Sequence, residues 1–139
     1  MKKTENYRSH HEQIRVILSD IKRGLTLTEV SNQPENITVH IRQLFGKFST
    51  HLALEDRAFY PRAIANDNEK LSSTARRFQA EMGGLGDTFH AYRQKWPGPL
   101  AISKSPADFI TETKNIISLL EKRLEREEGE LYVLYDQYA

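Results

Sequence analysis

Residues 37–58 read ITVHIRQLFGKFSTHLALEDRA and are typical of one long helix in a bundle. Apolar side chains recur every three or four positions, which is the spacing of a single helix face. The positions on that face are Ile37, Ile41, Leu44, Phe48, His51, Glu55 and Ala58. His51 and Glu55 therefore stand where a bundle normally buries apolar residues. Burying an unpaired charge costs on the order of several kcal/mol, and a bound metal ion is the usual reason for it.

Three further segments carry the same helical spacing. Helix-breaking residues divide the chain, and we expect helices over residues 5–27, 34–65, 69–96 and from residue 106 onward. Short connections make consecutive helices antiparallel. The sequence thus predicts an all-α fold, an antiparallel up-and-down four-helix bundle, as a single domain over residues 1–139. Gly83, Gly84 and Gly86 in the third helix leave open either a kink or the close approach of another backbone.

Composition narrows the class of protein. A formal net charge of +1 gives no electrostatic support for binding nucleic acid. The absence of cysteine excludes disulfides and thiolate metal sites. No segment approaches the roughly 20 apolar residues that cross a bilayer, and no signal peptide is evident. We therefore expect a cytoplasmic protein that binds neither nucleic acid nor membrane, with a homodimer or another protein partner left open.

The first and fourth predicted helices also carry polar residues on their inward faces. His11 interrupts the first, and Arg123 and Glu127 interrupt the fourth with the same i, i+4 spacing as His51 and Glu55. Counting along antiparallel helices puts these residues at about the same height, with His11 and His51 both roughly 25 Å from the turn between their helices. Imidazole and carboxylate donors suit iron, zinc or manganese. The alternative is a polar core layer in which His51 and Glu55 only hydrogen-bond to each other.

Other polar and aromatic residues are predicted to lie outside this layer. His10 and Glu128 have mostly polar helical neighbours, so they are interpreted as surface residues. Tyr60 and Tyr132 are interpreted as aromatic packing at one end of the bundle.

Two segments resemble a known family. HLALEDRAFYP (residues 51–61) and RLEREEGELY (residues 123–132), in a four-helix pattern of this length, resemble the hemerythrin or HHE cation-binding proteins. In the best-known members five histidines and two bridging carboxylates hold two irons, and members carry or sense oxygen, handle nitric oxide, or store and deliver iron. The resemblance implies that His11, His51, Glu55 and Glu127 occupy ligand positions.

Two positions depart from the family pattern. The histidine positions of helices three and four hold Met82 and Arg123, which would then border the cofactor. A guanidinium keeps its proton in a protein and would repel nearby metal ions. A complete di-iron centre is therefore not expected.

Two arrangements stay open. In one, His11, His51, Glu55 and Glu127 hold a single iron or other divalent ion, with Arg123 as an outer partner of a carboxylate. In the other, no metal binds and Arg123 bridges Glu55 and Glu127 in a buried charge network. The first predicts a sensor, regulatory or metal-handling bundle, and the second a metal-free interaction or signalling bundle. Metal-dependent redox chemistry on dioxygen, peroxide or nitric oxide is the less favoured, enzymatic alternative.

Overall fold

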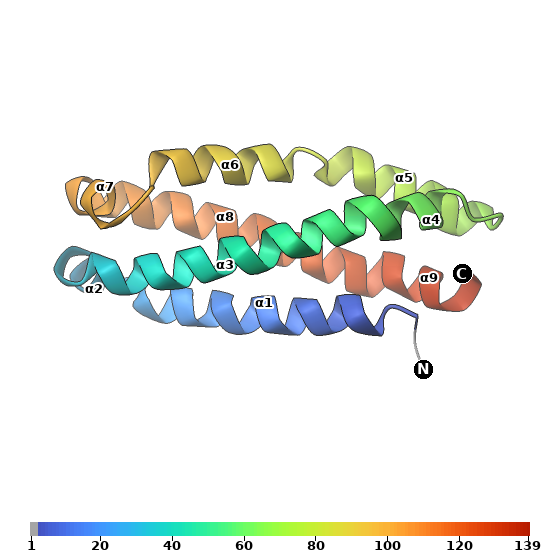
Figure 1. The fold of residues 1–139 in the computed structure, drawn as a ribbon, viewed down its shortest axis with the longest axis horizontal. Coiled ribbons are helices and arrows are strands. Elements are labelled where there is room, and N and C mark those ends of the chain that lie inside the picture. The colour runs from blue at the N-terminus through green and yellow to red at the C-terminus, as the bar shows by residue number, and fades with distance from the viewer. Residues whose placement is uncertain (1–2) are drawn as a thin grey trace.

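The computed structural model describes residues 3–139, and these residues form helices without any strand (Figure 1). In chain order the elements are α1 (Glu5–Gly24), α2 (Leu27–Asn32), α3 (Pro34–Leu54), the π-helical turn η1 (Glu55–Phe59), α4 (Tyr60–Ile64), α5 (Glu69–Met82), α6 (Leu85–Lys95), α7 (Pro99–Lys104), α8 (Pro106–Arg126), the π-helical turn η2 (Glu127–Leu131) and α9 (Tyr132–Tyr138). The predicted all-α fold is confirmed.

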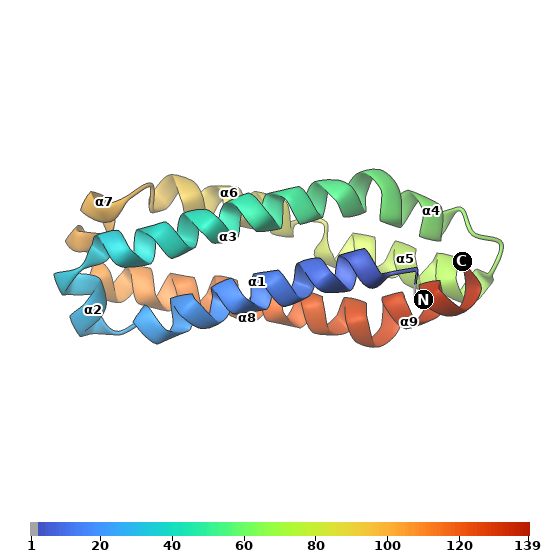
Figure 2. The same ribbon diagram turned by 60° about the horizontal axis from the view of Figure 1, so that its bottom comes forward.

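Consecutive long segments run in opposite directions along the bundle (Figures 1 and 2). The order is α1, then α3 with α4, then α5 with α6, and finally α8 with α9, so that the chain ends lie at the same end of the molecule. α1 packs along α3 and against α8, and α6 also packs against α8. Within residues 3–139, none of the helices combines the length and the apolar character needed to cross a lipid bilayer.

The first predicted helix ends earlier than residue 27. α1 ends at Gly24, and the six-residue α2 starts after Thr26, whose side chain accepts a hydrogen bond from the backbone N–H of Glu29. This cap satisfies a donor that the helix itself leaves free. α2 packs against α3, α7 and α8 and buries Val30. It therefore covers the end of the bundle that lies away from the chain ends.

The third predicted helix is broken in two. α5 ends at Met82 and α6 begins at Leu85, with Gly83 and Gly84 in a turn between them. A Cβ atom on Gly83 would lie 2.8 Å from the carbonyl oxygen of Gln79, whereas one on Gly84 would meet no atom within 4 Å. The absence of a side chain at Gly83 therefore permits this local backbone path, and the glycines mark an interruption of the helix.

Two π-helical turns widen the second and fourth long segments. In η1 the N–H of Tyr60 donates to the carbonyl of Glu55, and in η2 the N–H of Tyr132 donates to the carbonyl of Glu127. Each bond spans five residues, one more than in an α-helix. Pro61 follows η1, and its lack of an N–H favours a departure from the regular ladder at this point.

The widened turns change which residues face inward. After Glu55 the next fully buried side chains are Phe59 and Tyr60, while Ala58 is only partly buried. In the fourth segment Tyr132 is fully buried and Leu134 is only partly buried. Ala58, which the heptad predicts to face the core, is therefore only partly buried, because the π-helical turn contains one more residue per turn than an α-helix. Leu134 still packs against the smaller apolar cluster.

Two apolar clusters form the core. Phe48 belongs to the larger cluster and Phe59 to the smaller one, and the chain carries His51 and Glu55 between them. The same succession occurs from α8 into η2. A buried polar layer thus separates two apolar regions, as the interruption of the heptads predicts.

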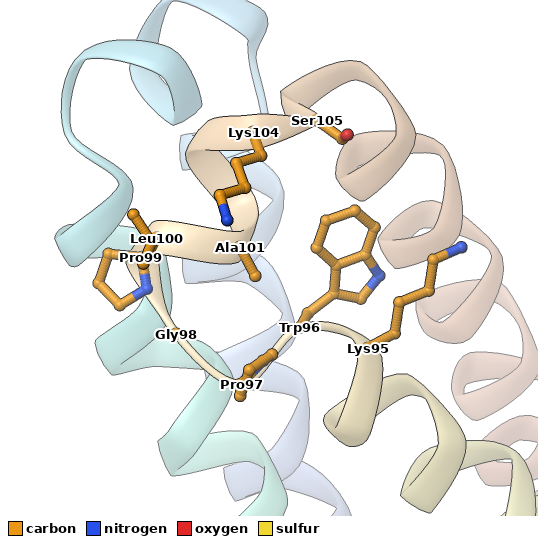
Figure 3. A pocket seen from close by; sticks show the side chains of 9 residues that line it. All are labelled: Lys95, Trp96, Pro97, Gly98, Pro99, Leu100, Ala101, Lys104 and Ser105. Carbon is orange, nitrogen blue, oxygen red and sulfur yellow. The ribbon is translucent and has the colours of Figure 1, made fainter.

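The connection from α6 to α7 borders a shallow, open pocket of about 570 Å³ at one end of the bundle (Figure 3). Trp96 and Pro97 form part of its wall, and the indole N–H of Trp96 donates to the carboxylate of Glu112 at 2.5 Å. None of the residues of the polar layer lines this pocket. The pocket lies where the chain passes from α6 through α7 to α8, and it is separate from the polar layer.

Stability measurements on two neighbouring glycine variants test the broken helix. Gly83→Ala should lower the free energy of unfolding by about 1 to 3 kcal/mol, because the new Cβ collides with backbone that must shift. Gly84→Ala should leave it unchanged or raise it by up to about 1 kcal/mol, because alanine restricts the unfolded chain. Urea denaturation checks both, and a Gly83→Ala protein as stable as the wild type would contradict the packing described above.

Candidate metal centre

Four metal-ligand-type side chains from separate parts of the chain meet in the polar layer. His11 comes from α1, His51 from α3, Glu55 from the start of η1 and Glu127 from the start of η2. All four are buried, and one donor atom from each lies within 4.8 Å of the others. These four residues therefore meet in one interior region, as the sequence predicts.

The closest contacts join the two imidazoles to one oxygen of each carboxylate. Nε2 of His11 lies 2.9 Å from Nε2 of His51 and 3.3 Å from Oε1 of Glu127. Nε2 of His51 lies 2.8 Å from Oε1 of Glu55. The two Nε2 atoms are within hydrogen-bond distance of each other, and each lies close to one carboxylate Oε1, so four donors of the types that bind divalent metals meet in one small region.

Two phenols hold the other oxygen of each carboxylate. The hydroxyl of Tyr60 donates to Oε2 of Glu127, and the hydroxyl of Tyr132 donates to Oε2 of Glu55, both at 2.8 Å. The Tyr132 oxygen also lies 3.1 Å from Nε2 of His11. These bonds orient the carboxylates so that their Oε1 atoms face the histidines, which is the usual function of outer-shell partners in metal sites.

The prediction that Tyr60 and Tyr132 pack only at the end of the bundle is wrong. Each tyrosine follows its glutamate by five residues, and the π-helical turn brings that spacing onto one face. A signal was present in the sequence. HLALEDRAFY (residues 51–60) and RLEREEGELY (residues 123–132) align as a repeat with leucine, glutamate, a second acid and tyrosine at matching positions.

Arg123 occupies the place in this repeat that His51 occupies in the other copy. Its side chain is 6% exposed and lies 3.5 Å from Glu55 through Nη2 and 3.5 Å from Glu127 through Nε. The bridging geometry that the charge-network alternative requires is therefore present. Both contacts are long for charge-assisted hydrogen bonds, and Nε has no partner of normal hydrogen-bond geometry.

Met82 lies beside Arg123 but is not one of the buried donors. It is the last residue of α5 and is partly buried, and both residues line a pocket of about 480 Å³ at the break between α5 and α6. Both residues therefore lie on the side of the layer that faces the broken helix, and their predicted position at the border of a cofactor stays a prediction.

Two residues interpreted as surface side chains contact the donor histidines. Nδ1 of His10, which is half-buried, lies 3.5 Å from Nδ1 of His51. Oε1 of Glu128 lies 3.4 Å from Nδ1 of His11, without the alignment of a hydrogen bond. Arg15 forms a two-pronged ion pair with Glu128 and fixes it there. The surface interpretation of His10 and Glu128 is therefore wrong.

Burial and mutual contacts set the charges of the layer. Burial, followed by the charge of His11, lowers the pKa of His51 to about 3, so its imidazole is neutral. Burial, followed by the charge of Glu127, raises the pKa of Glu55 well above its usual range. Burial acts in the same direction on Glu127, but His11 and Arg123 outweigh it and lower the pKa of that carboxyl to about 2.

Comparison with known proteins agrees with this geometry. The model of one protein family, described as Hemerythrin HHE cation binding domain, matches residues 2–135. The chain belongs to this family. No curated protein and no solved structure matches this hemerythrin-type chain.

The donors of this hemerythrin domain fit one metal ion. Oε1 of Glu127 is buried without a hydrogen-bond partner and lies 3.3 Å from Nε2 of His11, so a cation bound beside the two would satisfy it. When bound, a divalent ion would supply concentrated positive charge and Lewis acidity. Beside these donors, Arg123 carries a permanent positive charge and Met82 offers only a thioether, and neither side chain is a typical ligand of a second iron ion.

The pH dependence of stability tests the buried neutral imidazole. An imidazole in the unfolded chain takes up a proton near pH 6.5, whereas folded His51 resists protonation down to about pH 3. The unfolded state therefore binds more protons in this window, and stability falls as the pH is lowered through it, by up to about 1.4 kcal/mol per pH unit. As the pH is lowered from 6.5 to about 5, the free energy of unfolding of chelator-treated His51→Gln should fall less than that of the chelator-treated wild type. Urea unfolding at each pH measures both.

The matched control is His90→Gln, which changes an exposed histidine on α6. Its stability should vary with pH as that of the wild type does. Equal pH dependence of the wild type and His51→Gln would contradict the description of His51 as a buried, neutral group.

Proposed function

We propose that this hemerythrin domain binds one divalent cation, with iron as the first candidate. The ligands would be His11, His51, Glu55 and Glu127. The observation that carries the proposal is the convergence of four buried donors within 4.8 Å of one another. The unpartnered Oε1 of Glu127 supports it further, because a buried carboxylate oxygen without a partner is costly.

Binding of the cation is expected to displace a proton. The raised pKa of Glu55 means that this carboxyl is protonated in the metal-free domain over a wider pH range than usual. Ligand carboxylates must be ionised, so metal binding and proton release are coupled. The affinity for the cation should therefore fall as the pH is lowered.

We propose a sensor or metal-handling role rather than oxygen transport. Arg123 is a permanent cation 3.5 Å from both ligand carboxylates, so it competes with a metal ion for their charge. Competition of this kind weakens binding and makes occupancy depend on the concentration of free metal. A carrier in the manner of the best-known relatives would need the second ion that these residues do not accommodate.

A metal-free charge network is the second candidate. The contacts of Arg123 with Glu55 and Glu127 support it, because one cation between two carboxyl groups reduces the repulsion between them. Breaking such a buried network by removing one partner costs about 3 to 5 kcal/mol. The domain would then serve as an interaction or signalling bundle, whose stability depends on Arg123 without any ion.

Metal content separates these candidates. Protein purified without chelator should carry about one equivalent of iron or another divalent metal, because the donors fit one ion. His51→Ala should carry none while retaining helical circular dichroism, and the matched His90→Ala should carry as much as the wild type. Elemental analysis by mass spectrometry makes the measurement.

Two other outcomes would be decisive against the single-ion proposal. Two irons per chain with a near-ultraviolet charge-transfer band would show that a dinuclear centre forms despite Arg123. Metal-free protein that stays so after incubation with ferrous iron, and that is destabilised by Arg123→Leu, would favour the charge network.

Restoring the family pattern should raise iron uptake. Arg123→His with Met82→His removes the competing cation and adds two imidazoles next to the donor layer, where both residues line one pocket. We expect iron bound per chain to increase from about one towards two, measured after anaerobic loading and desalting. Uptake no greater than that of the wild type would argue that residues 82 and 123 are not oriented towards the donors.

A further inference from the structure

The break between α5 and α6 forms a pocket on the side of the polar layer where Arg123 lies. Its volume is about 480 Å³, within the usual range of small-molecule sites. Gly84 and Leu85 line it from the broken helix, and Arg123 lines it from α8. The pocket therefore connects the buried guanidinium to the surface of the bundle.

The charge of this pocket is positive. Lys122, Arg123 and Arg126 all contribute from α8, and Glu81 is the acid in the lining. Arg126 pairs with Glu81 and also lies 4.0 Å from Glu130. Arg123 contacts the two carboxylates of the polar layer, so Lys122 is the lining cation for which the described residues show no ion pair. The whole chain carries a formal net charge of only +1, which makes this local excess of cations a property of the site rather than of the protein.

The same pocket has apolar walls. Met82, Leu85 and Leu119 line it, and the Leu119 side chain is 46% exposed. A large apolar side chain beside a cationic group is suited to a molecule that has both an apolar body and a negative charge. An inorganic anion would leave these walls uncovered.

Arg123 has hydrogen-bonding capacity that the polar layer does not use. Its contacts with Glu55 and Glu127 use Nη2 and Nε and are both 3.5 Å long, which leaves Nη1 without a hydrogen bond to the polar layer. A guanidinium carries five N–H donors in a planar fork that matches a carboxylate. A buried cation with such long contacts gains from a closer anionic partner.

We propose that this pocket binds a small organic carboxylate, with its charge near Arg123 and Lys122 and its apolar body against Leu85 and Leu119. None of the four proposed cation ligands lines this pocket, although Arg123 contacts Glu55 and Glu127 from it.

Octanoate is a suitable probe because it joins a carboxylate to an apolar chain. Calorimetric titration of the protein as purified should show saturable binding of octanoate. Octanamide, which has the same chain without the charge, should bind at least about tenfold more weakly, as the loss of one charged contact predicts. Inorganic phosphate should also bind more weakly, because it lacks the apolar body.

Two pairs of variants locate the site. Gly84→Leu adds a side chain where a Cβ atom meets nothing within 4 Å at the pocket lining, so it should fill the pocket and weaken octanoate binding at least about tenfold. Gly86→Leu has equally open surroundings but does not line the pocket, and it should bind as the wild type does. Lys122→Ala should weaken binding severalfold, whereas Lys114→Ala on the same helix should not.

Three outcomes would overturn the proposal. They are octanamide binding as tightly as octanoate, Gly84→Leu retaining the wild-type affinity, and the absence of any octanoate binding at millimolar concentration. Circular dichroism of each variant shows that the compared proteins are folded.

Discussion

Charge balance in a dry interior is the constraint on which the rest of this structure depends. The polar layer buries two carboxyl groups, two imidazoles and one guanidinium between two apolar clusters. With His51 neutral and the pKa of Glu55 raised, Arg123 and Glu127 carry opposite charges side by side. A cation bound between the carboxyl groups would displace the proton that the raised pKa of Glu55 retains. The donor geometry and the presence of Arg123 therefore act in opposite directions on metal affinity.

The two π-helical turns give the layer its shape. Each begins at a ligand-type glutamate and places a tyrosine five residues later on the same inward face. Each phenol then binds the glutamate of the other segment, Tyr60 with Glu127 and Tyr132 with Glu55. The second and fourth segments are thus joined through two reciprocal hydrogen bonds. A buried phenol without such a partner would be costly, so the turns, the tyrosines and the carboxylates stabilise one another.

The departures from the hemerythrin pattern lie together. Arg123 and Met82 stand on the same side of the layer, next to the break between α5 and α6 in the upper part of Figure 1. In this family the third helix of the best-known members supplies histidines, whereas here it is interrupted by Gly83 and Gly84 and lines a pocket rich in cations. This side of the layer thus differs in chemistry from the side of the four ligand-type residues, which come from α1, α3 and the two π-helical turns.

Periodicity alone determined the fold class and the height of His11, His51, Glu55 and Glu127, because a regular helix keeps one face and a constant rise per residue. The same reasoning failed C-terminal to each glutamate. There a π-helical turn shifts the inward face by one residue, and only packing across the bundle decides whether the turn forms. The contacts of Tyr60 and Tyr132 with the glutamates were therefore visible only in the structure, although the repeated spacing of these tyrosines was present in the sequence. The positions of His10 and Glu128 beside the donor histidines, and the opening of the third helix onto Arg123, likewise belong to the tertiary structure, since they depend on which helices become neighbours and at what separation.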